Sequence, residues 1–536
     1  MGHMEYIPPG EIEKPVNSVY YLPHHCVFKE DSTTTKLRVV FDGSATTSTG
    51  QSLNDTLMVG PTVQDDLYSI IMRFRFYPIA LSADIAKMYR QVALEDKSKD
   101  FHRILWRLNK SDEIKHLRMT RVTYGIALSA FYSTRCLNEV ADQSKNPMIK
   151  ESLKNCFYVD DFLGGANDKH EAERLISDLC EELNSHEFPL RKWTSSNAKI
   201  IEGLPEHLRE KSDVLELFSD EYKIKALGVS WKPNKDISCF STALPELKLL
   251  TKRTLLSTIS KLFDPMGWLA PFIINFKCLM QQLWVQGFDW DSEVDQKTKE
   301  KWYELTGTLP QLLELQIPRS MISHPIKEVQ LHVFCDASEK AYAAAIYARI
   351  TNDDGKTFAY LLTSKTKVAP VKAISVPKLE LCGASLATKL LKSVHSILRK
   401  TNLKITSHAW TDSTIVLQWL AQLPRTWNTF VANRVSQIQE TLPRSDWKHV
   451  PTAVNPADLA SRGVLADTLI SSSLWWNGPD WLTKDERHWP NLLPSLVEAP
   501  EKRTVKAKTN AESEQIRTVL ANHAQNEEMT DGIFRL

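Results

Sequence analysis

Residues 157–165 read Phe157-Tyr158-Val159-Asp160-Asp161-Phe162-Leu163-Gly164-Gly165, so two adjacent carboxylates lie between short apolar segments. Two glycines follow, and the pattern predicts a tight β-hairpin with Asp160 and Asp161 at its tip. Successive side chains of a strand point to opposite faces. Only one of the two carboxylates can therefore face a given site fully, and a further acid must come from another segment.

Asp84 is the candidate for that further acid. It follows the apolar run Pro78-Ile79-Ala80-Leu81, which is typical of a buried strand. Carboxylates that converge at strand ends suit two hard divalent ions held roughly 3.5–4 Å apart. Two adjacent acids in a loop can also form only a solvated turn, so the motif needs support from the rest of the chain.

That support comes from six short segments taken in order: Tyr21-Leu22-Pro23-His24-His25, Leu37-Arg38-Val39-Val40-Phe41-Asp42-Gly43-Ser44, Ser52-Leu53-Asn54-Asp55, Ala83-Asp84-Ile85-Ala86-Lys87-Met88-Tyr89, Tyr158-Val159-Asp160-Asp161 and Leu227-Gly228-Val229-Ser230-Trp231. In the same order they resemble the motifs of a reverse transcriptase. More narrowly, the chain resembles the Pol polyprotein of BEL/Pao-class long-terminal-repeat retrotransposons over about residues 18–490.

The resemblance implies a multidomain α+β and α/β protein with a right-hand polymerase (fingers, palm and thumb), a connection and a ribonuclease H-like domain. We expect fingers and palm over residues 1–235, a helical thumb and connection over 236–327, and the ribonuclease H-like domain over 328–465. Asn234 to Pro245 reads as a linker because a proline lies near each end. Residues 466–536 are expected to form a tryptophan-rich packing extension and a mobile tail.

In the polymerase, the resemblance assigns Asp84, Asp160 and Asp161 to two Mg²⁺ ions, with Mn²⁺ as an alternative. One ion would activate the primer 3′-hydroxyl and the other would hold the triphosphate. Arg38 matches the fingers arginine that grips the incoming triphosphate, for which a planar fork is suited. Lys36 competes with Lys29 for the role of a second fingers cation.

Four further matches describe how the nucleotide and the primer would be held. Tyr89, five residues after Asp84, is expected to be the sugar gate, and Lys192 to protonate the departing pyrophosphate. Tyr124 and Gly125 occupy the place of the motif that packs on the templating pair. A tyrosine stands at its centre, so a glutamine contact to the nucleotide cannot be carried over. The primer grip is expected at Leu227, Gly228, Val229 and Trp231.

A second acidic set, Asp336, Glu380, Asp412 and Asp458, follows in a strand, helix, strand and loop pattern that is typical of ribonuclease H. Four acids brought together would repel one another unless cations bind. Two Mg²⁺ ions are therefore expected at this site also, where they would place a water against an RNA phosphate. Val454-Asn455-Pro456 fills the place in which some relatives carry a histidine, so no catalytic histidine is assigned.

Composition places the chain among ordinary globular proteins, with 42% hydrophobic residues, 24% charged residues and a net charge of +1. No apolar run approaches the roughly 18 residues of a membrane span, and no membrane partner is expected. The eight cysteines contain no CxxC pair, so a zinc finger is not indicated. Reduced thiols favour a cytoplasmic protein, and the resemblance implies a virus-like particle.

The leading interpretation is an RNA- and DNA-dependent DNA polymerase with an attached ribonuclease H. Its partners would be an RNA template, a DNA primer, RNA/DNA hybrid and deoxynucleoside triphosphates, and a homodimer stays open. The alternative is a domesticated Pol-derived protein that binds nucleic acid without catalysis, against which the intact acids argue. An aspartic protease needs Asp-Thr-Gly or Asp-Ser-Gly, which neither Phe41-Asp42-Gly43-Ser44 nor Cys335-Asp336-Ala337-Ser338 supplies.

Overall fold

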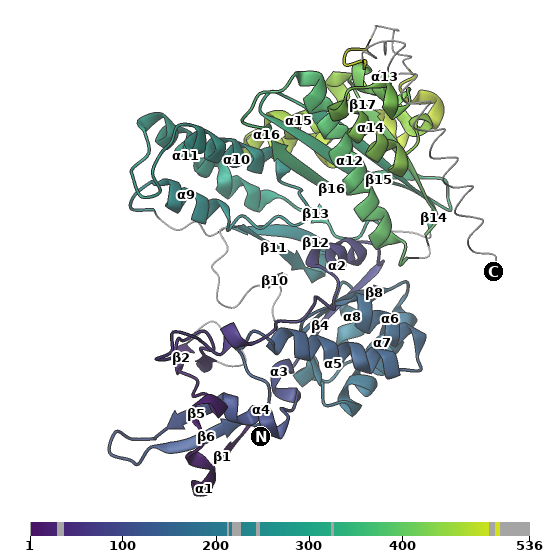
Figure 1. Ribbon diagram of the computed structural model, residues 1–536. Coiled ribbons are helices and arrows are strands. Elements are labelled where there is room, and N and C mark those ends of the chain that lie inside the picture. The colour runs from purple at the N-terminus through teal and green to yellow at the C-terminus, as the bar shows by residue number, and fades with distance from the viewer. Residues whose placement is uncertain are drawn as a thin grey trace, which may run out of the picture.

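The computed structural model describes residues 2–28, 37–211, 214–216, 227–242, 247–322, 326–401, 403–491 and 499–503. Its strands form five sheets. Figure 1 shows the N-terminal sheets at the bottom, a helix-covered sheet in the middle, and the sheet with the longest strands at the top. A group of helices lies beside the upper sheet. The mixed α/β multidomain class expected from the sequence is confirmed.

The first part contains a three-stranded antiparallel sheet and a separate two-stranded hairpin. The sheet order is β1 (Met4–Tyr6), β6 (Lys115–Met119) and β5 (Arg103–Trp106), and the hairpin pairs β2 (His24–Phe28) with β3 (Leu37–Phe41). Short helices accompany them: α1 (Pro9–Ile12), α3 (Met88–Gln91) and α4 (Asp96–Lys99). Phe41 shares a core with Ile104 and Met119, so the hairpin and the sheet form one packed unit.

The second part is a four-stranded antiparallel sheet with helices packed on it. Its order is β7 (Phe157–Tyr158), β8 (Asp161–Ala166), β4 (Ile79–Ile85) and β9 (Leu190–Ser195). The helices are α5 (Ser129–Gln143), α6 (Pro147–Asn155), α7 (Lys169–Ser185) and α8 (Ala198–Glu202). The apolar stripe expected between Asp168 and Asn184 is confirmed, because α7 buries Ala172, Leu175, Ile176, Leu179 and Leu183.

A small sheet and three helices follow. The sheet order is β10 (Leu215–Glu216), β11 (Leu227–Lys232), β12 (Ile237–Thr242) and β13 (Ile317–Pro318), and the helices are α9 (Lys252–Ile259), α10 (Ala270–Val285) and α11 (Gln296–Thr308). The linker expected over Asn234 to Pro245 was wrong. Half of it is β12, which pairs with both β11 and β13 and buries Cys239 and Phe240, while residues 243–245 lie outside the described residues.

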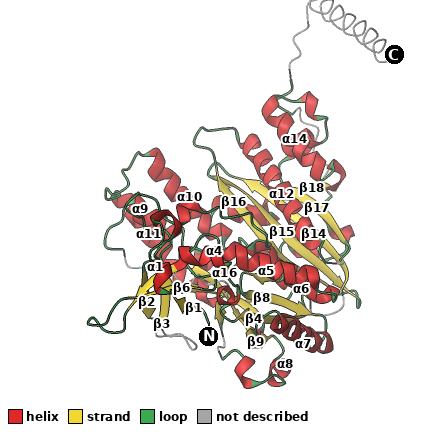
Figure 2. Cartoon of the chain, turned by 60° about the horizontal axis from the view of Figure 1, so that its bottom comes forward, coloured by secondary structure: helices red, strands yellow, loops and turns green. Residues whose placement is uncertain are grey.

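The last sheet has the order β16 (Thr357–Val368), β15 (Ala341–Asn352), β14 (Ile326–Ala337), β17 (Ile405–Thr411) and β18 (Trp447–His449). β14, β15 and β16 form an antiparallel meander, whereas β17 and β18 run parallel to β14. Its helices are α12 (Val376–Leu398), α13 (Thr414–Leu420), α14 (Thr429–Thr441) and α15 (Pro456–Arg462). Figure 2 shows α12 lying along this sheet, where it packs on β14 and β15.

The tryptophan-rich segment packs on this sheet, as expected, through α16 (Ala466–Ser471), α17 (Ser473–Asn477) and the turns that follow. Trp475 is fully buried and its Nε1 donates to the Trp268 carbonyl over 2.8 Å. Trp481 and Trp489 lie around Trp410 with ring-centroid separations of 4.5 and 5.8 Å. Most of the tail expected to be mobile lies outside the described residues.

Two buried arginines, Arg75 and Arg319, join the C-terminal end of α2 (Leu67–Phe74) to the parts of the chain that follow. Arg319 is 1% exposed and binds both oxygens of Asp236 over 2.6 and 2.7 Å. Its Nη1 donates to the carbonyls of Phe74 and Tyr77 over 2.5 and 2.8 Å. Arg75, also 1% exposed, donates to the Leu361 carbonyl of β16 over 2.7 Å.

A glycine turn makes a second connection, between α10 and β16. Gly267 has φ of 71°, and a Cβ on it would lie 2.0 Å from the carbonyl oxygen of Ser364. The Ser364 N–H donates to the Met266 carbonyl over 3.0 Å. Only a glycine allows the turn to approach the strand this closely. One hydrophobic core accordingly runs from α2 through α9, α10 and α11 into the last sheet.

Arg319→Met should lower the free energy of unfolding by about 3 kcal/mol, because it leaves the partly exposed Asp236 carboxylate and several backbone carbonyls without their donor. Urea denaturation would measure this. The matched control is Arg253→Met, since Arg253 binds Asp291 where their side chains are 61% and 73% exposed. That substitution should change stability by less than about 1 kcal/mol. Equal loss of stability in the two variants would contradict a structural role for Arg319.

Candidate active sites

The hairpin around residues 157–165 forms between β7 and β8, with Val159 and Asp160 as its two-residue turn. Val159 has φ of 55°, a left-handed conformation that a β-branched side chain rarely adopts. Such strain costs about 1–3 kcal/mol and persists only where the surroundings hold it. Here the Val159 N–H donates to Gln64 Oε1 over 2.9 Å, and the Ile85 N–H donates to the Asp160 carbonyl over 2.9 Å.

The acids predicted to form the polymerase site lie where β4 and β8 run side by side. Asp84 of β4 lies directly across from Asp161, the first residue of β8. Directly opposed residues of an antiparallel pair project to the same face. The structure therefore brings Asp84 and Asp161 onto one face, with Asp160 in the adjoining turn.

Lys192 is the cation that contacts these acids. Its Nζ donates to Asp84 Oδ2 over 2.8 Å. A register shift between β4 and β9 accompanies its φ of 54°, so a β-bulge presents this side chain to Asp84. Burial lowers the pKa of Lys192, but the hydrogen bond and the charge of Asp84 outweigh burial and raise the pKa above its ordinary value. The ammonium thus offsets part of the acidic charge.

Tyr89 and Tyr124 pack against each other beside the turn, with ring centroids 5.0 Å apart. The guanidinium of Arg90 lies 5.4 Å from the ring centroid of Phe41 and 5.9 Å from that of Tyr124. Burial and, after it, the charge of Asp160 raise the pKa of Tyr89 to about 12. The phenol is therefore uncharged at neutral pH.

Gly125 lies where its backbone closely approaches the end of β3. It has φ of 81°, and a Cβ there would lie 1.9 Å from the carbonyl oxygen of Phe41. Its own carbonyl accepts from the Gly43 N–H over 3.2 Å and from Asn54 Nδ2 over 3.0 Å. Arg38 is half-buried in β3, three residues before Phe41. Lys36 and Lys29 lie outside the described residues.

The primer-grip candidates form the β11–β12 hairpin. Leu227 and Gly228 begin β11 and pair with Thr242 and Ser241. Val229 and Trp231 are buried to 2% and 0% exposure, and the Trp231 ring meets the Phe74 ring edge-on at 5.2 Å. These two side chains therefore anchor the hairpin to α2, and they face the protein core rather than a bound strand.

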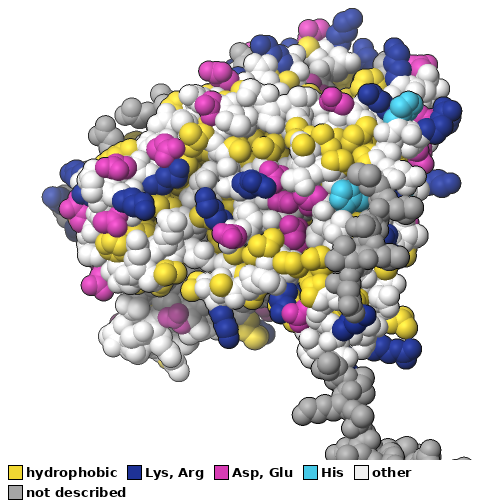
Figure 3. Space-filling model, turned by 90° about the horizontal axis from the view of Figure 1, so that it is seen from above, with side chains coloured by type: hydrophobic (Ala, Val, Ile, Leu, Met, Phe, Trp, Pro, Cys, Tyr) yellow, Lys and Arg dark blue, Asp and Glu magenta, His cyan; other side chains and the backbone are white. Residues whose placement is uncertain are grey.

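The second site has three carboxylates in contact range. Three side chains each offer one oxygen, and these oxygens lie within 4.8 Å of one another: Asp336 near the end of β14, Glu380 in the second turn of α12, and Asp412 just after β17. Asp336 is 3% exposed and Glu380 is 9% exposed. Figure 3, which looks down on this part, shows acidic side chains gathered near the middle of the face.

Hydroxyls hold two of these carboxylates. Ser461 Oγ donates to Asp336 Oδ2, and Thr452 Oγ1 donates to Asp412 Oδ2 over 2.7 Å. Burial, and then the charges of Asp336 and Asp412, raise the pKa of Glu380 to about 9. Burial raises the pKa of Asp336 to about 6, against the hydrogen bond from Ser461, and the charges of Asp412 and Asp458 add to the rise.

Asp458 is not part of that close group. It lies in the first turn of α15, and its Oδ1 accepts from Arg462 Nε over 2.6 Å. Its charge still raises the pKa of Asp336, so it lies at the edge of the same site. The structure therefore brings three of the four candidates together and leaves the fourth in an ion pair.

The donor atoms of this site fit a hard divalent cation. Among the described residues, Glu380 Oε2 and Asp412 Oδ1 are buried without a hydrogen-bond partner. A buried carboxylate oxygen without a donor is costly, and carboxylate oxygens are the ligands that Mg²⁺ and Mn²⁺ take. The polymerase acids offer the same chemistry from β4 and β8.

Two family models match the chain. Residues 32–229 match the reverse transcriptase (RNA-dependent DNA polymerase) family, and residues 251–413 match the Pao retrotransposon-like RNaseH-like domain. The two matches stand in the order expected for the reverse transcriptase–ribonuclease H region of a BEL/Pao Pol polyprotein. The chain is accordingly an enzyme with an RNA-directed DNA polymerase domain and a ribonuclease H-like domain, and both families generally use divalent metals.

The fold resembles that of a solved foamy viral protease–reverse transcriptase. The dRH form in complex with double-stranded DNA is 15% identical, with a TM-score of 0.52 over 84% of this chain and 67% of that chain. The form in complex with RNA/DNA hybrid is 13% identical, with a TM-score of 0.49 over 84% of this chain and 52% of that chain. No curated protein matches the sequence significantly. None of the helices in the described ranges is long and apolar enough to cross a membrane.

Three residues that contact the sites were missed in the sequence. Ser461 could have been predicted at the site, because it lies three residues after Asp458 and therefore on the same face of the helix. Thr452 and Gln64 had none, since each meets its partner across a long stretch of chain. The contacts of Thr452 with Asp412 and of Gln64 with Val159 span 40 and 95 residues.

Mg²⁺ should raise the thermal unfolding midpoint of this enzyme relative to protein in EDTA. A ligand that binds only the folded state at about a hundred times its Kd stabilises that state by about 2.7 kcal/mol. Glu380→Gln should reduce the Mg²⁺-dependent shift, which differential scanning fluorimetry measures. The control is Glu339→Gln, an exposed acid in the neighbouring β14–β15 turn. Equal shifts in the two variants would show that Glu380 holds no cation.

Proposed function

We propose that this BEL/Pao enzyme synthesises DNA on RNA and DNA templates at the acids of β4 and β8, and cleaves the RNA strand of RNA/DNA hybrids at the acids of β14, α12 and β17. The observation that carries the proposal is the presence of two separate carboxylate centres in one chain. Asp84 and Asp161 are opposed across two strands, and Asp336, Glu380 and Asp412 lie within 4.8 Å on another sheet.

Mg²⁺ would be held by Asp84, Asp160 and Asp161 in the first centre. In the second it would be held by Asp336, Glu380 and Asp412, with Asp458 joining when Arg462 releases it. Mn²⁺ suits the same oxygen ligands. When bound, such ions supply an activated hydroxyl or water and stabilise the charge on the phosphate.

In the polymerase centre the protein binds and orients the nucleotide. Arg38 would grip the triphosphate with its planar guanidinium, while Tyr124 and Gly125 would support the templating pair. Lys192 would hold a proton at Nζ for the departing pyrophosphate, a role that its raised pKa and its 2.8 Å contact with Asp84 support. The primer end would rest on the backbone of the β11–β12 hairpin, since Val229 and Trp231 point inward.

In the nuclease centre the protein fixes the carboxylates. Ser461 donates to one oxygen of Asp336, and Thr452 donates to one oxygen of Asp412. Asp412 Oδ1 and Glu380 Oε2 are left for ligation. Because these carboxylate oxygens are already in place, they need little rearrangement when a divalent cation binds, and such preorganisation favours catalysis.

The proposed partners are an RNA template, a DNA primer, RNA/DNA hybrid and deoxynucleoside triphosphates. The fold shared with the foamy viral protease–reverse transcriptase, which is in complex with double-stranded DNA, supports a duplex partner. The family resemblance implies synthesis in the cytoplasm within a virus-like particle.

The two activities should be separable by single substitutions. Asp160→Asn should lower primer extension by about a hundredfold or more and leave hybrid cleavage intact, and Glu380→Gln should do the reverse. Primer extension and RNA cleavage on one labelled hybrid substrate would measure both. Loss of both activities in either variant, with the fold retained, would contradict two independent centres. Absence of both in the unaltered protein would favour a domesticated binding protein instead.

Tyr89→Ala should admit ribonucleotides. We expect the ratio of kcat/KM for deoxynucleotide over ribonucleotide to fall about 10- to 100-fold, the range that shape alone gives in a pocket. Tyr89→Phe is the matched control, because it keeps the ring and removes only a hydroxyl that is uncharged at neutral pH. Selectivity that survives in Tyr89→Ala would mean that Tyr89 only packs against the fingers core.

A further inference from the structure

The strained turn of the polymerase depends on a loop that precedes α2. Val159, at φ of 55°, donates its N–H to Gln64 Oε1 over 2.9 Å. Gln64 is half-buried and has no other side-chain hydrogen bond among those recorded for the described residues. Its amide oxygen is thus placed to satisfy the backbone of the residue between Tyr158 and Asp160.

The next residue, Asp65, is held by a buried arginine. Arg73 of α2 has a side chain that is 4% exposed, and its Nη2 donates to Asp65 Oδ2 over 2.7 Å. The same nitrogen donates to the carbonyl of Asn155 over 2.6 Å. Asn155 ends α6 and lies two residues before β7. Arg73 therefore links the loop at 64–65 to the segment that leads into the hairpin.

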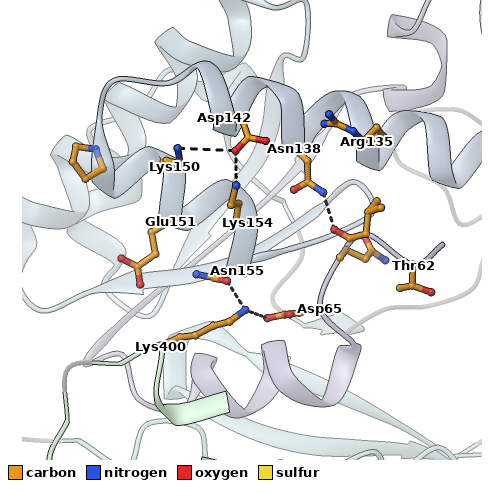
Figure 4. Close-up of a pocket in the computed structure, with 13 residues that line it drawn as sticks. Thr62, Asp65, Arg135, Asn138, Asp142, Lys150, Glu151, Lys154, Asn155 and Lys400 are labelled. Atoms are coloured by element: carbon orange, nitrogen blue, oxygen red, sulfur yellow. Dashed lines mark hydrogen bonds and ion pairs between the residues drawn. The ribbon is translucent and has the colours of Figure 1, made fainter. Parts of the chain in front are cut away.

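Lys400 reaches the same two residues from the ribonuclease H-like part. It follows α12, and its Nζ donates to Asp65 Oδ2 and to Asn155 Oδ1, each over 2.8 Å. Figure 4 shows Lys400 extending from the lower ribbon to Asp65 and Asn155. These contacts span 335 and 245 residues of sequence. The ribonuclease H-like part thus contacts both the loop at 64–65 and the segment that leads into the polymerase turn.

A pocket of about 820 Å³ opens beside these contacts, and Gln64, Asp65, Asn155 and Lys400 all line it. Solvent reaches the ion pair, since the side chains of Lys400 and Asp65 are 40% and 28% exposed. The attraction between them is therefore sensitive to salt. Arg73, by contrast, is shielded from solvent.

We propose that Gln64 is a positioning residue for nucleotide addition, and that Lys400 acts on it through Asp65, so that the placement of the ribonuclease H-like part adjusts the polymerase turn. The inference rests on the proposed function of Asp160 and Asp161 as polymerase acids. Val159 adopts an unfavourable φ, and such a conformation relaxes when its hydrogen-bond acceptor is removed. A displacement of the following carboxylates by a fraction of an ångström is enough to slow the reaction, because misplacement by 1 Å can cost about a hundredfold.

The first test uses Gln64→Met, which keeps the length of the side chain and removes the acceptor, and Gln64→Glu, which keeps an acceptor oxygen. Gln64→Met should lower kcat for deoxynucleotide addition about tenfold, or about 1.4 kcal/mol, with KM for the nucleotide changed less than twofold. Gln64→Glu should restore most of kcat. Cleavage of RNA/DNA hybrid reports on folding and should be unchanged in both variants.

Gln143→Met is the matched control for Gln64, because Gln143 is an exposed glutamine at the end of α5 that bonds only to Glu139. It should retain full kcat. If Gln64→Met keeps the kcat of the unaltered enzyme, or if Gln64→Glu fails to recover it, the positioning role is wrong. If the unaltered enzyme extends no primer, the proposed function itself fails, which is a distinguishable result.

The second test concerns the link to the ribonuclease H-like part. Lys400→Met should lower kcat two- to fivefold at low salt, and the difference from the unaltered enzyme should vanish at high salt. The control is Lys404→Met, an exposed lysine a few residues away. In the Gln64→Met background, Lys400→Met should have no further effect, because residues that act through one contact are not additive. Additive losses in the double variant would overturn the link.

Discussion

Two guanidinium groups buried beside each other fix the polymerase part to the ribonuclease H-like part. Arg75 and Arg319 are each 1% exposed, and the one carboxylate bound to them is Asp236 on Arg319. Burial, with the neighbouring charge of Arg319, lowers the pKa of Arg75 to about 9. Backbone carbonyls of Phe74, Tyr77 and Leu361 supply the remaining acceptors. Because each carbonyl lies at a fixed place on its helix or strand, the two parts cannot slide past each other without losing several of these bonds.

The two acidic centres offset their charge in different ways. At β4 and β8 a lysine offsets the negative charge, since Lys192 Nζ lies 2.8 Å from Asp84 Oδ2. In the described part of the chain, no lysine or arginine forms an ion pair with Asp336, Glu380 or Asp412, and burial raises the pKa of Glu380 to about 9 instead. A carboxyl of that kind keeps its proton at neutral pH until a cation takes its place. In the first centre the ammonium of Lys192 thus offsets acidic charge, and in the second a proton on Glu380 does so.

Much of the fold and of both sites follows from sequence patterns that are local. The apolar stripe of α7 and the strand–helix order around Asp336, Glu380 and Asp412 could be predicted because helix and strand periodicities are short-range. β12 was mistaken for a linker because the prolines near both ends of 234–245 suggested one, whereas all of β12 pairs with the neighbouring β11 and its first two residues also pair with the distant β13. The ion pair between Asp458 and Arg462 has helical spacing, yet the sequence could not tell whether the acid would turn to a cation of its own helix or to the site. Gln64 carried no pattern, since its partner lies 95 residues away.

The C-terminal end of α2 explains why the polymerase turn and the ribonuclease H-like sheet are coupled. Arg73 and Arg75 are two residues apart and both are buried. Arg73 binds Asp65 and Asn155 beside the turn, and Arg75 binds Leu361 on β16. The end of α2 therefore places Arg73 against the segments beside the polymerase turn and Arg75 against β16. Because both side chains are buried, neither can move without its neighbours. A shift of β16 against α2 changes the position of the segments that support Val159, so the strained turn can persist only while the whole junction is assembled.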